Sequence, residues 1–199
     1  SLPQNTAIAV KAAVLPFSRF RTPEGVVVDS LLSPEMRSTG EVMGLDTLYD
    51  TAFAKAQAGA GSPLPTEGKV FVSVANHDKR NVIIYAKMLE QLGFEIVSTG
   101  GTADVLRRNG VNSTVASKFA EANGQHSIVD MVRNGEIDLI LNTPAGGAAR
   151  SDGYEIRAAA VSVGCPVMTT ISEFAAAVQA ITALRERSWE IINLQEHGE

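Results

Sequence analysis

Hydrophobic and polar positions alternate regularly along the chain from residue 69 onward. Short apolar runs predict strands over 69–75, 94–98, 113–115, 137–142 and 167–169. Apolar residues at helical spacing between these runs predict helices over 79–92, 102–109, 127–133, 153–163 and 171–185. Because each crossover between parallel strands must return over the sheet, this order places helices on both faces. We therefore predict an α/β fold with a doubly wound, parallel, five-stranded sheet.

The N-terminal part follows a different pattern. Residues 7–14 predict a strand that ends before Pro16, a second short apolar run covers 25–32, and 33–44 is a segment punctuated by polar residues and glycines. Residues 45–57 predict a helix, and 58–68 have the composition of a linker, with small residues and two prolines. We place a domain boundary at 58–68, with domains at 1–57 and 69–199. Residues 1–57 contain too few elements to bury a core alone and are expected to be a piece of something larger.

One turn in the regular part has the chemistry of a phosphate site. The strand that begins at Phe94 runs into the sequence Ser-Thr-Gly-Gly-Thr, and a helical pattern follows at once. Gly100 and Gly101 leave room for a ligand to approach main-chain N–H groups. Thr99 and Thr102 can aim their hydroxyls at one point, and a helix N-terminus adds N–H donors and partial positive charge. The alternative is a plain strand-to-helix connector with Thr102 as the N-cap.

Polar residues also follow the other predicted strands. Lys79 comes after the first strand of the regular part, Lys118 after the third, and Asn142 and Thr143 after the fourth. Ligands of doubly wound sheets bind at the carboxyl ends of the strands, so these side chains are expected to converge on the Ser-Thr-Gly-Gly-Thr turn. Lys79 opens a helix, where a cation is unfavourable unless an anion lies nearby; the alternative is an exposed lysine beside Asp78. The convergence predicts a phosphate site.

Composition narrows the function classes. The formal net charge of −5 over 199 residues gives no reason to expect nucleic acid or an anionic membrane as a partner. The single cysteine, Cys165, excludes an internal disulfide and fits a cytoplasmic protein. His77 and His126 have no nucleophile or carboxylate partner by spacing, and metal-ligand spacing is absent. A phosphate site without acid–base residues indicates a binding module or an allosteric site, with no catalytic residues and no metal.

Longer segments resemble a known family. LLSPEMRSTGEVMG (31–44) and AFAKAQ (52–57) resemble the end of the second ATP-grasp half in the carbamoyl-phosphate synthase large-subunit family. The remainder resembles that family's C-terminal allosteric domain, of the methylglyoxal-synthase-like fold. The matching segments are SVANHDK (73–79), STGGT (98–102), ASKF (116–119), RNGEIDLILNT (133–143) and DGYEIRAAAV (152–161). The resemblance covers essentially the whole chain and implies an ATP-grasp remnant at 1–57 followed by an allosteric domain at 69–199.

The resemblance implies a role in a larger enzyme. The family is an ATP-dependent, glutamine-hydrolysing ligase that makes carbamoyl phosphate from bicarbonate and glutamine-derived ammonia for pyrimidine and arginine biosynthesis. It uses ATP with Mg²⁺ or Mn²⁺, pairs with a glutaminase small subunit, and assembles as an oligomer of heterodimers. The resemblance therefore implies that this region is regulatory and not itself catalytic.

The resemblance also implies an effector and its site. The allosteric domain of the family binds a nucleotide monophosphate, with UMP as an inhibitor and IMP as an activator in some members. The positions that match its phosphate and ribose site are Lys79, Thr99, Thr102, Lys118, Asn142 and Thr143, with Gly100 and Gly101 in the turn. The chain departs from the family at Pro144, where a hydroxyl is usual, and at Gly147-Ala148, where an arginine pair is usual. Ala12 and Val167 replace residues associated with ornithine control, which is therefore not expected.

Three other interpretations were weighed. A methylglyoxal synthase needs an aspartate base, but the matching positions hold Gln125 and Pro144, so the proton abstraction has no base. The cyclohydrolase of the purine pathway shares the Ser-Thr-Gly-Gly-Thr turn but has an Arg-Lys-His-rich run that this chain lacks. A pure interaction module remains conceivable, and the polar strand ends argue against it.

Overall fold

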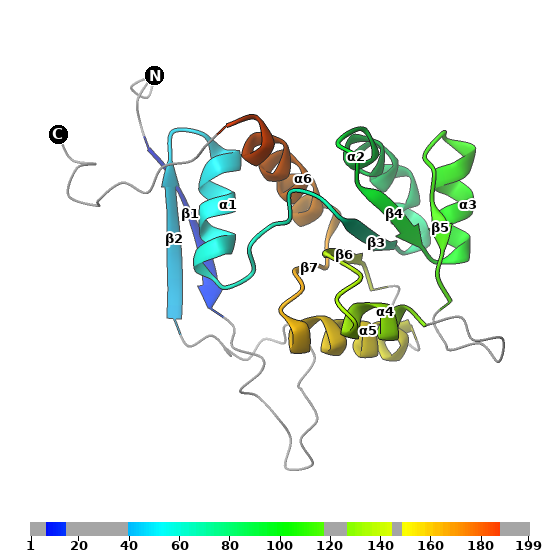
Figure 1. Ribbon diagram of the computed structural model, residues 1–199. Coiled ribbons are helices and arrows are strands. Elements are labelled where there is room, and N and C mark those ends of the chain that lie inside the picture. The colour runs from blue at the N-terminus through cyan, green and yellow to red at the C-terminus, as the bar shows by residue number, and fades with distance from the viewer. Residues whose placement is uncertain (1–6, 15–39, 118–126, 145–148, 188–199) are drawn as a thin grey trace, which may run out of the picture.

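The computed structural model describes residues 7–14, 40–117, 127–144 and 149–187. A two-stranded unit with one helix lies beside a larger sheet that has helices on both faces (Figure 1). The predicted apolar run at 25–32 and the candidate residues Lys118, Gln125, His126 and Gly147 lie outside the described residues.

The N-terminal unit consists of strand β1 (Ile8–Val14), strand β2 (Gly40–Asp46) and helix α1 (Tyr49–Gly59). The strand predicted at 7–14 is confirmed. The pattern at 33–44 predicts a segment broken up by polar residues and glycines, with no strand. This prediction is wrong for its last residues, because 40–46 form β2 and pair with β1 in antiparallel register. The helix predicted from residue 45 begins later, since Leu45 and Asp46 belong to β2.

The larger sheet confirms the predicted fold class. Its strands are β3 (Lys69–Ser73), β4 (Glu95–Ser98), β5 (Thr114–Val115), β6 (Leu139–Asn142) and β7 (Val167–Met168). They lie in the order β5-β4-β3-β6-β7, and all neighbours are parallel. The chain moves outward from β3 to β5 and then returns to β6 on the other side of β3. The strand order therefore reverses between β3 and β6, and this reversal is where such sheets bind ligands.

Helices cover the two faces of the sheet separately (Figure 1). Helices α2 (Lys79–Gln91), α3 (Gly100–Arg108) and α6 (Ile171–Glu186) supply residues to one apolar core. Helices α4 (Ile128–Arg133) and α5 (Ala149–Val163) supply residues to the other. Side chains of a strand alternate between faces, so Val70 and Val72 of β3 enter the first core and Phe71 enters the second.

The N-terminal unit packs on the first core through α1 and α6. Phe53 on α1 and Leu64 in the following segment are buried in the same cluster as Phe174 and Ile181 of α6. Residues 60–68 form neither helix nor strand, in line with the composition of 58–68. The division of the chain into domains at this segment stays a prediction.

No helix in the described part of the chain has both the length and the apolar character needed to cross a bilayer.

Candidate functional site

Three hydroxyl groups meet at the carboxyl ends of β3 and β4. Ser73 Oγ, at the end of β3, lies 3.4 Å from Thr99 Oγ1, and Thr99 Oγ1 donates to Thr102 Oγ1 at 3.4 Å. The Val74 N–H points to Thr102 Oγ1 at 3.5 Å. We call Ser73, Thr99 and Thr102 the hydroxyl cluster. These contacts are long for O–H···O bonds, so the hydroxyls gather without tight mutual bonding.

Thr99 occupies the N-cap of α3 but does not cap it. Its backbone is extended, with φ −69° and ψ 151°, and its side chain makes no capping hydrogen bond. The alternative with Thr102 as the N-cap is wrong, because the helix begins at Gly100 and the Thr102 N–H already bonds to the Thr99 carbonyl. The N–H groups of Gly100 and Gly101 have no partner within the helix, and both glycines are exposed. Free N–H donors therefore border the hydroxyl cluster.

Lys79 brings a cation to the same turn. It is the first residue of α2 and is half-buried. Its Nζ lies 3.1 Å from where a Cβ on Gly101 would stand. Asp78, the neighbour that could have neutralised it, lies instead 3.3 Å from His77 Nε2. The ammonium group thus reaches across the turn, and none of the ion pairs between described residues includes it.

Asn142 and Thr143 reach this edge of the sheet from β6. Asn142 pairs in register with Ser73, so it starts one strand away from the hydroxyl cluster. The Thr143 hydroxyl accepts from the Ala75 N–H at 2.9 Å, and the Thr143 N–H donates to the Ser73 carbonyl at 3.1 Å. The structure therefore brings together Lys79, Thr99, Thr102, Asn142 and Thr143, and Thr143 also fixes the exit of β3.

Sequence reasoning missed two polar residues at this edge. Ser73 was quoted only as part of a longer segment, although it ends a buried strand beside a turn of threonines. Arg157 on α5 is fully buried, and its Nη1 donates to Asn142 Oδ1 at 2.7 Å. The signal for Arg157 was a cation within the otherwise apolar run of residues 156–161.

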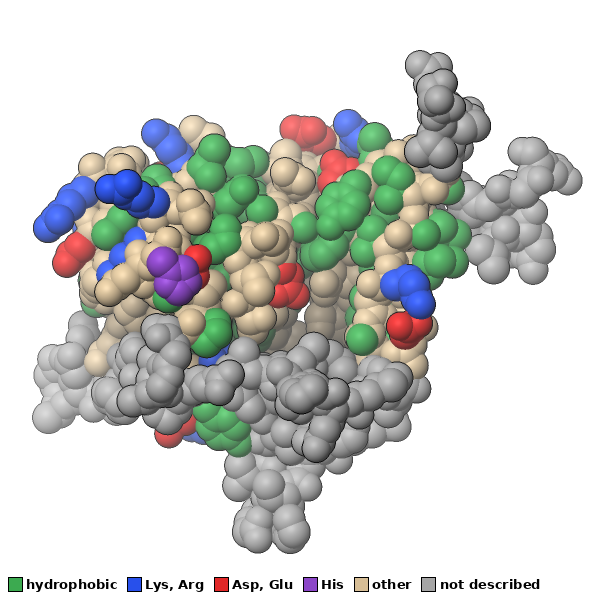
Figure 2. Space-filling model, turned by 180° about the vertical axis from the view of Figure 1, so that it is seen from behind, with side chains coloured by type: hydrophobic (Ala, Val, Ile, Leu, Met, Phe, Trp, Pro, Cys, Tyr) green, Lys and Arg blue, Asp and Glu red, His purple; other side chains and the backbone are tan. Residues whose placement is uncertain are grey.

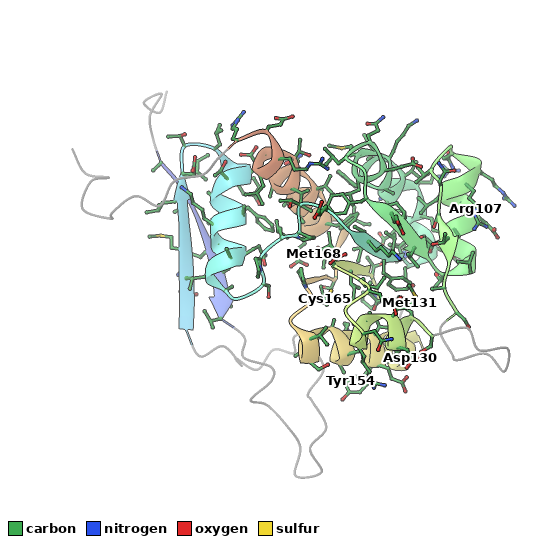
Figure 3. All side chains as sticks on the ribbon, in the orientation of Figure 1. Arg107, Asp130, Met131, Tyr154, Cys165 and Met168 are labelled. Atoms are coloured by element: carbon green, nitrogen blue, oxygen red, sulfur yellow. The ribbon has the colours of Figure 1, made fainter. Side chains whose placement is uncertain are left out.

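The titratable side chains described outside this edge of the sheet, Cys165 and His77 among them, do not form the arrangement that a nucleophile needs. Burial, together with the nearby Asp138 carboxylate, raises the pKa of the Cys165 thiol to about 12. Cys165 packs on the α4–α5 side of the sheet (Figure 3). Figure 2 shows a histidine side chain at the surface beside an acidic one. The prediction that His77 has no carboxylate partner is wrong, because its exposed Nε2 lies 3.3 Å from Asp78 Oδ2 of the next residue. Within the described ranges, no group of three or more His, Cys, Asp or Glu side chains could hold a metal ion.

The arrangement is suited to an anion. Hydroxyls, main-chain N–H groups and one ammonium group all donate hydrogen bonds, and the N-terminus of α3 adds partial positive charge. A phosphate dianion has several acceptor oxygens and forms strong, charge-assisted bonds with such donors.

Comparison with known proteins gives two findings. The family model for the MGS-like domain matches residues 81–169. The chain is 67% identical over 199 residues to the carbamoyl phosphate synthase large chain of Kocuria rhizophila. This match covers 99% of our chain and 18% of that relative. The chain is also 67% identical over 201 residues to the large chain of Pseudarthrobacter chlorophenolicus and 53% identical over 201 residues to that of Streptomyces coelicolor, each match covering 100% of this chain and 18% of the relative. The chain thus spans about a fifth of the length of these relatives.

Proposed function

Because this chain belongs to the carbamoyl phosphate synthase large-chain family and contains an MGS-like domain, we propose that it is a regulatory region that binds a nucleotide monophosphate. The proposed effector is of the UMP or IMP type. Its phosphate would lie against the hydroxyl cluster, Lys79 and the N-terminus of α3. The 199-residue chain itself would not catalyse a reaction.

We propose the activity of the whole enzyme for the longer protein to which such a region belongs. That protein would use ATP with Mg²⁺ or Mn²⁺ to make carbamoyl phosphate from bicarbonate and glutamine-derived ammonia. A glutaminase subunit would supply the ammonia, in a cytoplasmic oligomer of heterodimers that serves pyrimidine and arginine synthesis. The support is the sequence identity to large chains over the full length of this chain.

One observation carries the effector proposal. The Lys79 ammonium group reaches across the turn to within 3.1 Å of where a Cβ on Gly101 would stand, and none of the ion pairs between described residues includes it. A phosphate would supply an anion for it at a point where hydroxyls and helix N–H groups also converge. Lys118, outside the described residues, stays a predicted second cation of the site.

The neighbouring strand suggests where the nucleoside would lie. Adjacent strands are about 4.8 Å apart, so Asn142 on β6 is one to two strand spacings from the β3–β4 end that holds the hydroxyl cluster. A nucleoside attached to a phosphate at that cluster can extend over this distance toward β6. Asn142 would then meet the ribose or the base.

Calorimetric titration of the 199-residue chain with UMP and IMP tests the proposal. We expect binding in the wild type and a loss of about 1.5–3 kcal/mol in Lys79→Ala, because a charge-assisted phosphate contact is removed. Thr99→Ala should weaken binding in the same direction. Lys87→Ala is the matched control, since Lys87 is an exposed lysine of the same helix.

Absence of binding at millimolar UMP and IMP would contradict the proposal. Equal affinity in the wild type, Lys79→Ala and Thr99→Ala would show instead that the nucleotide binds somewhere else on the chain.

A further inference from the structure

Threonine hydroxyls hold the main chain where it leaves β3. Ser73 is the last residue of β3 in register with β6. Val74 and Ala75 follow and are buried, with exposed fractions of 8% and 4%, so their main-chain N–H groups need acceptors within the protein. The Val74 N–H points to Thr102 Oγ1 at 3.5 Å. The shorter bond, at 2.9 Å, runs from the Ala75 N–H to Thr143 Oγ1.

Thr143 grips this segment at two points. Its hydroxyl accepts from the Ala75 N–H, and its own N–H donates to the Ser73 carbonyl at 3.1 Å. Thr143 is buried, with an exposed fraction of 7%. A buried N–H that loses its acceptor is costly, so the hydroxyl oxygen of Thr143 is required where it stands. A group that the sequence placed among the ligand donors therefore serves as an acceptor within the protein.

One short turn connects the held segment to Lys79. The Asp78 N–H donates to the Ala75 carbonyl at 3.0 Å and closes a 3₁₀ turn over Asn76–Asp78. Lys79 follows directly, with φ −56° and ψ −34°, and begins α2. Because this turn is itself hydrogen-bonded, the position of Ala75 determines where the Lys79 side chain starts.

The far end of the Lys79 side chain has little room for error. Its Nζ lies 3.1 Å from where a Cβ on Gly101 would stand, so the ammonium group passes close to the turn at the start of α3. A charge-assisted N–H···O bond is short, about 2.7–2.9 Å between heavy atoms. A shift of the Lys79 backbone by a fraction of an ångström would therefore weaken its bond to a phosphate.

We propose that Thr143 is a positioning residue that fixes the exit of β3 and so places the Lys79 ammonium group at the phosphate. Thr143 affects effector affinity through Lys79 and does not itself contact the nucleotide. This inference rests on the proposed effector site and assigns one of its predicted ligand residues a different task.

A double-mutant cycle on the folded chain tests this role. Calorimetric titration with UMP and with ribose 5-phosphate compares the wild type, Thr143→Val, Lys79→Ala and the double variant. Valine has nearly the shape of threonine but offers no acceptor to the Ala75 N–H. We expect Thr143→Val to weaken both ligands by about 5- to 20-fold, because the Lys79 contact is displaced. In the Lys79→Ala background the same change should alter affinity by less than about twofold, since the group it acts through is gone.

Two further variants separate positioning from general loss of stability. Thr143→Ser keeps the acceptor and should bind ribose 5-phosphate within about threefold of the wild type. Thr182→Val is the matched control, because Thr182 Oγ1 donates to the Val178 carbonyl at 2.9 Å in the second half of α6. This control should lower the free energy of unfolding and leave the affinity for both ligands unchanged. NMR titration at high ligand concentration extends the measurement to the weak binding of the Lys79→Ala variants.

The possible outcomes separate the two proposals. If the losses in Thr143→Val and Lys79→Ala are additive, Thr143 acts independently of Lys79, and the positioning role is overturned while the effector site stands. A folded Thr143→Val variant with wild-type affinity overturns it as well. If the wild type binds neither ligand, both proposals are overturned. If Thr143→Val does not fold, Thr143→Cys takes its place in the cycle, because a thiol fills a similar space and is a weak acceptor.

Discussion

Hydroxyl groups that look equivalent in the sequence have different tasks in the structure. Thr143 accepts a 2.9 Å bond from the Ala75 N–H and so holds the end of β3 beside β6. Thr102 is 1% exposed and faces the Val74 N–H. Thr99 is half-buried, and its contacts to Ser73 and Thr102 are both 3.4 Å. Of the three threonines, Thr99 is therefore the one with the most capacity for a ligand.

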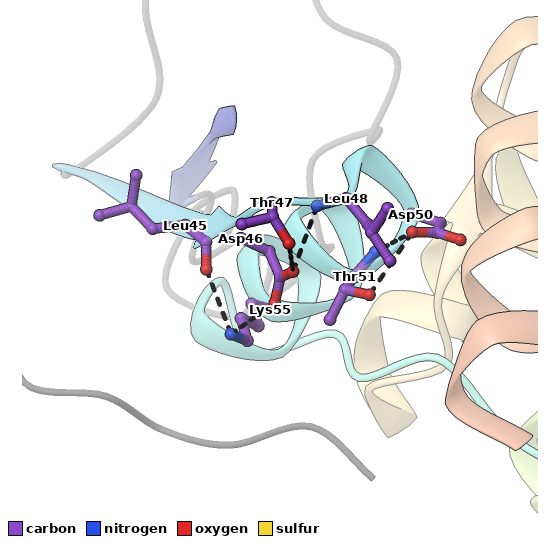
Figure 4. Close-up of polar contacts among 7 residues, drawn as sticks. All are labelled: Leu45, Asp46, Thr47, Leu48, Asp50, Thr51 and Lys55. Carbon is purple, nitrogen blue, oxygen red and sulfur yellow. Dashed lines mark hydrogen bonds and ion pairs between the residues drawn. The ribbon is translucent and has the colours of Figure 1, made fainter. Parts of the chain in front are cut away.

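The ionisation of Asp46 is linked to the stability of the N-terminal unit. Its carboxylate accepts from Lys55 Nζ at 2.8 Å and from the Leu48 N–H at 3.2 Å (Figure 4). Burial alone would raise the pKa of Asp46, but the bonds from Lys55, Leu48 and Thr47 outweigh burial and lower the pKa. A folded-state pKa below the unfolded value means that the stabilisation is present above the unfolded pKa and is lost as the pH falls through the folded one.

We expect Asp46→Asn to lower the free energy of unfolding by about 1–2 kcal/mol at neutral pH. The difference between variant and wild type should shrink as the pH falls from about 5 to about 2, because the wild-type carboxyl then becomes neutral as well. Urea denaturation across this pH range measures it. Lys55→Met should lose a similar amount at neutral pH, and the double variant should be little worse than either single one. Fully additive losses would contradict the pairing.

At the scale of elements, glycines mark the ends of two helices, and these helix ends could be predicted from the sequence. Gly93 and Gly110 follow α2 and α3 with φ of 89° and 79°, a left-handed conformation that favours glycine and ends a helix. The helices predicted at 79–92 and 102–109 end directly before these two glycines. Gly44 in β2 is different, because it does not have a positive φ. It is required because atoms of α1 occupy the space that a side chain would need.

Gly44 allows β2 to pack directly against the backbone of α1. A Cβ at this position would lie 2.6 Å from the Ala56 N and would overlap the Ala52 carbonyl oxygen. We expect Gly44→Ala to lower the free energy of unfolding by about 1–3 kcal/mol, since strand and helix must move apart. Chemical denaturation measures the loss.

Gly40→Ala is the matched control, because Gly40 lies in the same strand and has nothing within 4 Å of its would-be Cβ. Its effect should be within about 0.5 kcal/mol. Equal losses in the two variants would show that strand propensity, and not packing on α1, makes Gly44 necessary.

At the scale of the whole molecule, α6 joins the proposed effector domain to the N-terminal unit. It follows β7 and packs on α1, which in turn packs on β2. Phe53, Leu64 and Phe174 lie in one apolar cluster across this junction. An effector signal would have to pass through this packed region or through the segment at 60–68.

We expect a longer connection to weaken regulation of the full-length enzyme. Inserting a flexible Gly-Ser stretch after Gly61, which is exposed, should reduce the response of carbamoyl phosphate synthesis to UMP or IMP and leave activity without effector unchanged. The same insertion after Gly135, in an exposed turn between α4 and β6, is the control. A full effector response in the Gly61 variant would argue against this route.

The sequence by itself determined the succession of strands and helices along the chain that forms the parallel sheet, because hydrophobic period and glycine position are local signals. It also placed Lys79, Thr99, Thr102 and Asn142 at strand exits, which doubly wound topology gathers at one edge. β2 could not be predicted, since its pairing with β1 depends on residues far away in the chain.

Only the tertiary structure decided which polar side chains are buried and which groups they contact. Hydropathy assigns an arginine and an asparagine to the surface, yet Arg157 and Asn142 lie inside and bond to each other. The direction of the Asn142 amide follows from that contact between β6 and α5, and no local pattern encodes it. The geometry of the proposed site therefore depends on packing between distant segments, whereas the strands and helices around it follow from local sequence.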